Sequence, residues 1–342
     1  MKQTMSSYAI GVDLGGTSLR ISAVDSDGNL LHKITSGTQV AKGRDFVVAE
    51  MCEAIRQLSV KFSSLGELEG IGIGVPGIID MDTGIVRKSP NLPDWIDYPV
   101  RDEIERRLGT QVILENDANV AALGEKWLGA GREVDSLCMI TLGTGVGGGL
   151  VLNGKIWRGM TGMAGEIGHT TVEPDGPPCG CGSRGCIEQF ASAPAIKRMA
   201  VEAIAKGEAP ALGRVMKEEP EFSSLVVYQM AVQGDAAAQQ IFRKVGAALG
   251  ITIARLVNVL NLPMYVMAGG VVNAWEAFGP SLMEEVRKRS FVYAATESDS
   301  NLSNKKKTII TRALLGSDAG LYGAARLPML EPHAMEKIEA KA

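Results

Sequence analysis

The stretch YAIGVDLGGTSLRISAV, residues 8–24, decides the fold class of this 342-residue chain. Its first part, Tyr8–Asp13, is apolar and predicts a buried strand. Its last part, Ser18–Val24, alternates apolar and polar residues and predicts a second, half-buried strand. The turn Gly15-Gly16-Thr17 separates the two strands. The segment therefore predicts a β-hairpin whose glycine-rich turn follows an aspartate at a strand end.

This first glycine turn has the composition of an anion-binding turn. Adjacent glycines lack Cβ atoms, so the backbone can approach a ligand closely, and N–H groups in such a turn can point at phosphate oxygens. Asp13, at the strand end, could hold Mg²⁺ through water. An ordinary glycine hairpin would explain the same residues, so the turn alone leaves both interpretations open.

A second glycine run, LGTGVGGG at residues 142–149, repeats the arrangement. It joins the predicted strands Ser136–Leu142 and Gly149–Leu152, and it holds more glycine than a plain hairpin needs. No helical pattern follows, which excludes a dinucleotide fingerprint, and no Gly-Lys-Ser/Thr follows, which excludes a P-loop. A phosphate-binding hairpin remains, and the repeated pattern is that of an internal duplication.

The run Glu115-Asn116-Asp117-Ala118-Asn119 lies between a predicted strand, Gln111–Leu114, and a predicted helix, Ala118–Leu128. One polar side chain would suffice to cap the helix, but four polar residues in this run exceed that need. A carboxylate held near a sugar hydroxyl can accept its proton as a phosphoryl group arrives. We therefore predict that Asp117 is a general base.

One histidine and three cysteines form a pattern of metal ligands. His169, Cys179, Cys181 and Cys186 supply the Cys₃His set of a structural zinc site, and glycines between the cysteines let a short loop wrap an ion. Three cysteines cannot pair fully in disulfides. Four protein ligands leave no open position, so this zinc would be structural and not catalytic.

Two glutamates bracket these ligands in the sequence. Glu166 lies in the run GEIGH, residues 165–169, and Glu188 follows the last cysteine closely. Carboxylates are acceptors suited to sugar hydroxyls, and a metal ion would fix the backbone that carries both. An isolated glutamate is more often solvated surface, but the flanking metal ligands favour binding.

Strands and helices alternate along the chain, which predicts an α/β protein. Residues 161–190, dense in Gly, Pro and Cys, predict an ordered loop region. Further predicted helices are Asp45–Phe62, Val100–Leu108, Asp235–Leu260, Trp275–Arg289 and Ser317–Arg326, and further strands are Gly70–Val75, Met264–Met267 and Thr308–Thr311.

Composition excludes several classes of protein. The formal net charge is −4 and the only dense basic run is Lys305-Lys306-Lys307, so no nucleic-acid partner is expected. No secretion signal and no membrane-spanning run is visible. Cys52 and Cys138 are isolated in apolar surroundings, and the other cysteines form the metal pattern. Reduced thiols of this kind indicate a cytoplasmic protein, and the lack of a membrane-spanning run predicts no membrane partner.

These motifs occur together, and in this order, in the ROK family (repressors, open reading frames, kinases), which the chain resembles over residues 8–327. The most specific part runs from Gly165 to Glu188, while the first hairpin is shared with sugar kinases, actin and heat-shock ATPases in general. The resemblance implies two ribonuclease-H-like α/β domains of the actin/hexokinase ATPase type around a central cleft. Residues 1–118 would form an N-terminal domain closed by the helix 317–327, and residues 119–316 a larger C-terminal domain with the zinc loop 165–190.

The resemblance also implies roles for single residues. Asp117 would be the base acting on the sugar 6-hydroxyl. The residues expected to bind sugar are Gly77, Asn91, Asn116, Asp117, Glu166, His169 and Glu188. Those expected to bind ATP and Mg²⁺ are Asp13, Gly15, Gly16, Thr17, Thr144, Gly145, Gly269 and Gly270, the last two beside the adenine. His169 could serve both zinc and sugar through its two ring nitrogens.

The implied activity is ATP-dependent phosphorylation of a hexose. Asn91–Trp95 and Glu115–Asn119 are similar to the members that act on glucose, whereas other members act on fructose, mannose, allose, N-acetylglucosamine or N-acetylmannosamine. Polyphosphate as the donor stays open, and members of the family are commonly homodimers or homotetramers.

A regulator is the alternative of a different class. Some family members are sugar-responsive repressors with a winged-helix segment before the first hairpin. Here that hairpin begins close to Met1 and the net charge is acidic, so we expect a kinase. A regulator that had lost catalysis would not need Asp13, Asp117 and both glycine turns.

Overall fold

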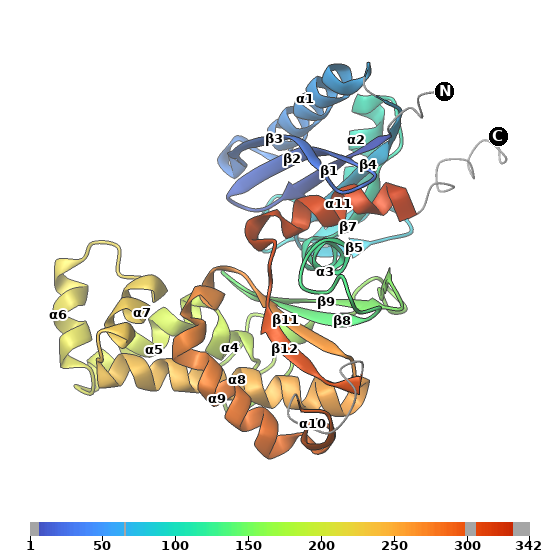
Figure 1. Cartoon of the computed structure of the whole chain (residues 1–342). Helices are drawn as coiled ribbons and strands as arrows, with labels where there is room; N and C mark the ends of the chain where they lie inside the picture. The colour runs from blue at the N-terminus through green and yellow to red at the C-terminus, as the bar shows by residue number, and fades with distance from the viewer. Residues whose placement is uncertain (1–6, 65, 298–305, 331–342) are drawn as a thin grey trace. The chain divides into compact units, whose positions relative to one another are not determined.

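The computed structural model of the chain describes residues 7–64, 66–297 and 306–330 (Figure 1). The chain divides into two compact units. As far as they are described, residues 1–136, 149–165 and 314–342 form unit 1, and residues 137–148 and 166–313 form unit 2. Lys305 of the basic run lies outside the described residues. The domain boundaries expected from the sequence stay predictions.

Unit 1 is built on a five-stranded sheet of order β3-β2-β1-β4-β7. Its strands are β1 Tyr8–Leu14, β2 Ser18–Asp25, β3 Leu30–Gly37, β4 Leu68–Val75 and β7 Ile113–Asn116, and a separate pair is formed by β5 Ile78–Asp80 and β6 Ile85–Lys88. The predicted hairpin of residues 8–24 is confirmed as β1 and β2. β3 has no buried residue, so its sequence carries no apolar period that could have predicted it.

Three strands of this sheet, β1, β4 and β7, run parallel. Their carboxyl ends therefore meet at one edge of the sheet. Asp13 of β1 is in register with Gly74 of β4, and Gly74 is in register with Glu115 of β7. This edge collects the polar residues that follow each strand.

Helices cover both faces of the sheet of unit 1 (Figure 1). They are α1 Arg44–Phe62, α2 Val100–Leu108, α3 Asp117–Trp127 and α11 Ala319–Leu330, with short η1 Val40–Lys42 and η5 Gly316–Asp318. Ile10 and Ile73 of the sheet share a hydrophobic core with Met51 of α1 and Ile104 of α2. On the other face α3 and α11 pack together. Burial of apolar side chains on both faces stabilises this three-layer arrangement.

The C-terminal helix α11 packs on the sheet and on α3 through glycine. A Cβ atom on Gly72 of β4 would lie 2.0 Å from the carbonyl oxygen of Ala324. A Cβ atom on Gly323 would lie 1.6 Å from the carbonyl oxygen of Val120. Because any larger residue would push these elements apart, glycine allows the last helix to complete the sheet that the first hairpin begins.

The second five-stranded sheet has the order β10-β9-β8-β11-β12. Its strands are β8 Leu137–Leu142, β9 Val146–Leu152, β10 Lys155–Ile156, β11 Met264–Ala268 and β12 Ile309–Arg312. β9 begins at Val146 and not at the predicted Gly149, so Gly147 and Gly148 belong to the strand and not to the turn. At Gly149 a Cβ atom would lie 2.6 Å from the carbonyl oxygen of Ala118, so close packing of α3 explains that glycine.

The helices of unit 2 follow the second glycine turn. They are η2 Ile167–His169, α4 Glu188–Ala191, α5 Ala193–Ala205, α6 Pro210–Glu218, α7 Ser224–Val232, α8 Ala236–Leu260, η3 Gly270–Ala274, α9 Trp275–Arg289 and α10 Phe291–Thr296. The predicted long helix is confirmed as α8, which packs closely on α9 (Figure 1). No element was predicted for α5, α6 and α7; α7, for example, is apolar over most of its length and has little helical period. Among the described helices, none has the length and apolar character needed to span a membrane.

Glu125 of α3 offers a test of this architecture. Its buried carboxylate accepts hydrogen bonds from the backbone amides of Ala130 at 2.8 Å, Leu314 at 3.1 Å and Leu315 at 2.7 Å. We expect Glu125→Ala to lower the free energy of unfolding by about 3 kcal/mol, since each buried amide left unsatisfied costs about 1–3 kcal/mol. Thermal unfolding checks this, with the exposed Glu133→Ala as control. Equal midpoints for Glu125→Ala and the wild type would contradict the assignment.

Candidate active site and metal centre

Unit 1 gathers one group of predicted site residues at the carboxyl edge of its parallel strands. Asp13 ends its strand beside the first glycine turn, and Asp117 is the first residue of α3, directly after β7. The members of this group are Asp13, Gly15, Gly16, Thr17, Gly77, Asn91, Asn116 and Asp117. The topology thus brings together residues as distant in the sequence as Asp13 and Asp117.

Hydrogen bonds and packing with neighbouring segments fix the first glycine turn. The Gly15 amide donates to the Ser18 carbonyl at 2.9 Å, and the Thr38 hydroxyl donates to the Gly15 carbonyl at 2.6 Å. A Cβ atom on Gly16 would lie 2.8 Å from the Cβ atom of Asn91. Asn91 therefore packs directly on the turn, while Thr17 is exposed.

Asp13 is a largely buried carboxylate with one cation nearby. Its side chain is 15% exposed, and its Oδ2 atom lies 3.5 Å from Nη2 of Arg20. Burial raises the pKa of Asp13; the negative charge of Asp318 raises it further and Arg20 lowers it. α11 passes so close that a Cβ atom on Gly320 would lie 2.8 Å from the Asp13 carboxyl carbon. A bound divalent cation would favour the ionised form of this carboxylate.

The junction between β7 and α3 is fixed by Asn116. Its Oδ1 atom accepts hydrogen bonds from the amides of Ala118 at 2.9 Å and Asn119 at 3.3 Å, and its Nδ2 atom donates to the Gly77 carbonyl at 3.3 Å. The capping interpretation is therefore correct for Asn116. Oδ1 of Asp117 also accepts from the Ala118 amide at 2.9 Å. The carboxylate of Asp117 thus lies at the positive end of the α3 dipole.

Two residues without a predicted role complete this junction. The buried carboxylate of Glu115 accepts hydrogen bonds from the Asn116 amide at 2.9 Å and from Nδ2 of Asn119 at 3.0 Å. Its other oxygen, Oε2, accepts from Nε of Arg158 at 2.6 Å. Arg158 is far from Glu115 in the sequence, and no local motif pointed to this pair.

In unit 2 the structure brings the four predicted metal ligands together. The ligand atoms of His169, Cys179, Cys181 and Cys186 all lie within 4.8 Å of one another. Nδ1 of His169 is 3.6 Å from Sγ of Cys179, and Sγ of Cys181 is 3.7 Å from Sγ of Cys186. A set of one nitrogen and three sulfur donors at this spacing fits a tetrahedral ion, and zinc is the usual occupant of such a set.

The protonation of these thiols responds to their surroundings. Burial is the main cause that raises the pKa of the Cys186 thiol to about 12. A hydrogen bond from the Ser183 backbone is the main cause that lowers the pKa of Cys181. A bound cation stabilises thiolates and would offset the burial of Cys186.

The loop of residues 165–190, which carries the four predicted ligands and is called the metal loop below, contacts the second glycine turn. Oε2 of Glu188 accepts a hydrogen bond from the Val146 amide at 3.0 Å, and the Ala193 amide donates to the Gly143 carbonyl at 2.8 Å. A Cβ atom on Gly145 would lie 2.6 Å from Oε2 of Glu188. The turn that contains Thr144 and Gly145 therefore packs against Glu188, the first residue of α4.

The two nitrogens of the His169 ring face different groups. Nδ1 faces the cysteine sulfurs, whereas Nε2 lies 3.9 Å from Oε2 of Glu166. The side chains of His169 and Glu166 are 37% and 54% exposed. Nδ1 can therefore hold a metal ion, while Nε2 lies beside the half-exposed carboxylate of Glu166.

The predicted pair Gly269 and Gly270 follows β11, which runs parallel to β8. Gly269 has a φ of 91°, and a Cβ atom there would lie 2.3 Å from the Leu142 carbonyl oxygen. These glycines thus adjoin the start of the second glycine turn, and both are exposed.

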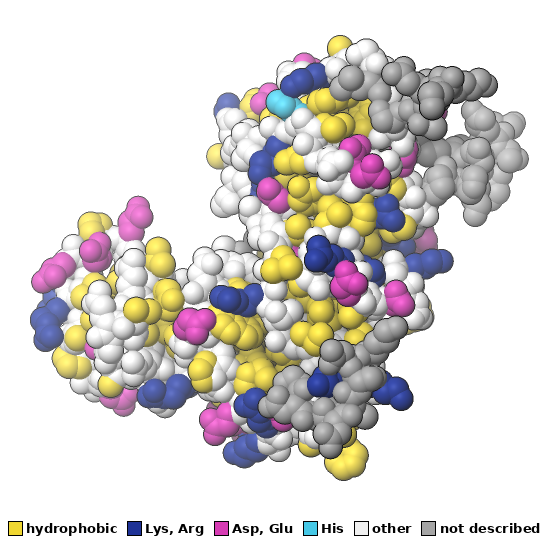
Figure 2. Space-filling view, viewed as in Figure 1, with side chains coloured by type: hydrophobic (Ala, Val, Ile, Leu, Met, Phe, Trp, Pro, Cys, Tyr) yellow, Lys and Arg dark blue, Asp and Glu magenta, His cyan; other side chains and the backbone are white. Residues whose placement is uncertain are grey.

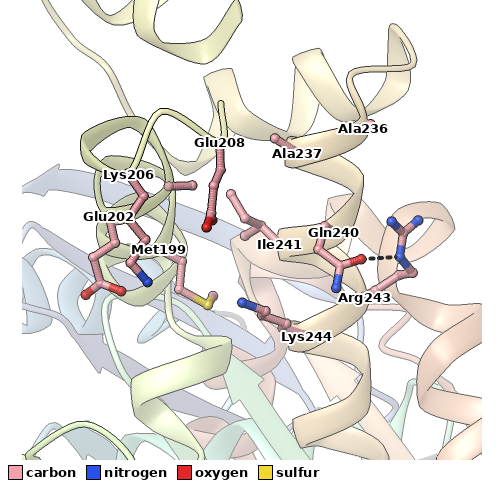
Figure 3. A pocket seen from close by; sticks show the side chains of 11 residues that line it. Met199, Glu202, Lys206, Glu208, Ala236, Ala237, Gln240, Ile241, Arg243 and Lys244 are labelled. Carbon is pink, nitrogen blue, oxygen red and sulfur yellow. Dashed lines mark hydrogen bonds between the residues drawn. The ribbon is translucent and has the colours of Figure 1, made fainter. Parts of the chain in front are cut away.

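Unit 2 also contains a groove of about 360 Å³ between α5 and α8. In Figure 3, Glu202 and Lys206 lie on one side of the groove, and Gln240 and Lys244 of α8 lie on the other. None of the predicted site residues lines this groove.

Comparison with known proteins places the chain in a family. The model of the ROK family matches residues 9–329, so the chain belongs to the ROK family. A glucokinase of Thermotoga maritima is 42% identical over 278 residues, which cover 81% of this chain and 86% of that protein. A xylose repressor of Caldicellulosiruptor bescii is 31% identical, covering 83% of this chain and 71% of that protein.

A solved structure is similar over nearly the whole chain. It is a ROK family glucokinase from Streptomyces griseus in complex with glucose and AMPPNP, with a TM-score of 0.74 and 34% identity, covering 94% of this chain and 98% of that one. The expected fold class, α/β with two ribonuclease-H-like units of the actin/hexokinase type, is confirmed by this likeness and by the two mixed sheets.

Substitutions at two glycines can test how closely the metal loop packs against β9. A Cβ atom on Gly168 would lie 1.9 Å from the Val146 carbonyl oxygen, whereas one on Gly180 would meet no atom within 4 Å. We expect Gly168→Ala to cost about 1–3 kcal/mol of unfolding free energy through overpacking, and Gly180→Ala to leave it nearly unchanged. Thermal unfolding of both variants measures this. A Gly168→Ala midpoint equal to that of Gly180→Ala would contradict the packing described.

Proposed function

We propose that this chain is a glucokinase, which transfers the γ-phosphoryl group of ATP to the 6-hydroxyl of glucose. The observation that carries the proposal is the position of Asp117, held at the first turn of α3 on the same sheet edge as Asp13 and its glycine turn. A carboxylate and an anion-binding turn at one edge are the parts that phosphoryl transfer needs. The similarity to a glucokinase at 42% identity supports this reading.

In this proposal backbone amides bind the phosphates of the nucleotide, and one carboxylate holds the Mg²⁺ ion that accompanies them. The amides of Gly15, Gly16 and Thr17, and those of Thr144 and Gly145, would donate to phosphate oxygens. Asp13 would hold Mg²⁺ through water. When bound, the metal ion would neutralise phosphate charge during transfer. Gly269 and Gly270 would border the adenine, where the absence of side chains leaves room for a flat ring.

The sugar would be bound by groups that accept and donate hydrogen bonds. Asn116 and Asp117 come from the strand–helix junction, and Glu166, His169 and Glu188 from the metal loop. Gly77 and Asn91 would line the sugar side. Asp117 would accept the proton of the 6-hydroxyl as the oxygen attacks phosphorus.

The metal centre has a supporting role in this proposal. The four ligands leave no open coordination position, so zinc would hold the loop that carries Glu166 and Glu188 and would not take part in the reaction. The loop contacts the second glycine turn through Glu188 and Val146. Metal binding would therefore order a sugar-binding loop and a phosphate-binding turn together.

The alternatives differ in substrate or in class. Another hexose, an N-acetylhexosamine or a polyphosphate donor would use the same arrangement. A sugar-responsive regulator is less well supported, since the repressor compared above is less similar than the glucokinase. Among the described residues on the face drawn in Figure 2, basic and acidic side chains are interspersed and form no basic stripe. A cytoplasmic location and a homodimeric or homotetrameric state remain part of the proposal.

A coupled assay of ADP release tests the function. We expect the highest kcat/KM with glucose and ATP, measured across a panel of hexoses and N-acetylhexosamines, with polyphosphate compared as donor through the sugar phosphate formed. A clear preference for another sugar would replace glucose in the proposal. Sugar binding without phosphorylation of any panel member would favour the regulator.

The role of Asp117 has its own test. We expect Asp117→Asn to lower kcat by about 10²–10⁴-fold, the usual contribution of a general base. Glucose binding, measured by calorimetry, should change little, because the amide keeps the size and one acceptor of the carboxylate. Near-normal turnover would remove Asp117 from the role of base.

We expect one zinc ion per chain in protein purified without added metal, measured by elemental analysis. Cys181→Ala should lose most of this zinc and lower the thermal midpoint, because a ligand of the tetrahedral set is removed. Cys52→Ala is the matched control, since Cys52 is a buried thiol outside the cluster and its loss should leave the zinc content unchanged. Wild-type protein without zinc would contradict the metal centre.

A further inference from the structure

We propose that Arg158 is a positioning residue for phosphoryl transfer, which keeps Asn116 and Asp117 in place through the buried carboxylate of Glu115. The inference rests on the proposed function, because that function makes Asp117 the base. It extends the site to a loop that no sequence motif had marked.

Glu115 needs a charged partner because it is buried. Its side chain has no exposed surface, and a buried carboxylate is costly unless it is paired and hydrogen-bonded. One oxygen is bound by the Asn116 amide and the Asn119 side chain, which are neutral donors. The other is bound by Nε of Arg158 at 2.6 Å, the short distance typical of a charge-assisted hydrogen bond.

Arg158 comes from a loop that is itself anchored at this edge. The Arg158 carbonyl accepts a hydrogen bond from the Ala164 amide at 3.1 Å, which closes the loop 158–164. At Gly162 a Cβ atom would lie 2.7 Å from Cγ of Met81 and 3.2 Å from the Ile79 carbonyl oxygen, so the loop packs against β5. These contacts fix the backbone from which the Arg158 side chain extends to Glu115.

The same contacts lead from Glu115 to the proposed base. Glu115 binds the backbone amide of Asn116, and Asn116 caps α3 and contacts the Gly77 carbonyl. Asp117 is the next residue. Without Arg158 the Glu115 carboxylate would reorient toward water and release the Asn116 amide and the Asn119 side chain. A displacement of about 1 Å at a reacting group can cost about 10²-fold in rate.

A double-mutant cycle with Arg158→Gln, Glu115→Gln and the double variant tests the inference. We expect Arg158→Gln to lower kcat by about 10- to 100-fold, with the KM for ATP within about twofold of the wild type. The double variant should lose no more than Arg158→Gln alone, because it leaves no unpaired buried charge. Arg158→Lys should recover part of the loss, and the exposed Arg106→Gln, whose ion pair has the same 2.6 Å distance, should have no effect.

The outcomes separate positioning from general stability and from the proposed function. All rates are measured below the thermal midpoint of each variant. A normal kcat for Arg158→Gln with a lowered midpoint would overturn the inference, as would losses of the two single variants that multiply in the double variant. If Arg158→Gln does not fold, Arg158→Lys and Glu115→Gln carry the same comparison, and a normal kcat in both would overturn it. A wild-type protein that phosphorylates no sugar would overturn both this inference and the proposed function.

Discussion

The first turn of α3 leaves backbone amides without helical partners, and the side chain of Asn116 satisfies two of them. This cap determines where β7 ends and in which direction α3 leaves the sheet. It also places Asp117 at the positive end of the helix, on the edge where the parallel strands β1 and β4 end. Were the junction built differently, the carboxylate would not lie on the edge that carries Asp13 and the first glycine turn.

In unit 2 the metal loop fixes the positions of predicted site residues, as the helix cap does in unit 1. His169 and the three cysteines converge within a few ångströms, and the backbone between them carries or adjoins Glu166, Gly168 and Glu188. Gly168 lies against β9 and Glu188 binds the Val146 amide, so the loop and the second glycine turn are one packed assembly. A zinc ion bound by these four residues would therefore stabilise the second glycine turn as well, although it would have no open coordination position for chemistry.

Much of this arrangement could be predicted from local sequence. The hairpin of residues 8–24 and the helix α8 follow from apolar periods, and the convergence of His169 with the three cysteines follows from residue type and spacing. The strand β3 could not be predicted, because it buries no side chain and so leaves no period. The pair of Glu115 and Arg158 could not be predicted either, because it depends on a loop that returns to the sheet edge from a distant part of the chain. Glu188 was predicted as a sugar ligand from its place beside the cysteines, but its contact with Val146 depends on packing that the sequence does not encode locally.

The position of glucose relative to Asp117 directly tests the proposed role of this carboxylate as the base. A crystal structure of the protein with glucose and a non-hydrolysable ATP analogue would measure the distance from the Asp117 carboxylate to the 6-hydroxyl oxygen. We expect about 2.6–3.2 Å, the range of a hydrogen bond that can pass a proton. A 6-hydroxyl bound by another side chain, with the Asp117 carboxylate out of reach, would contradict this role.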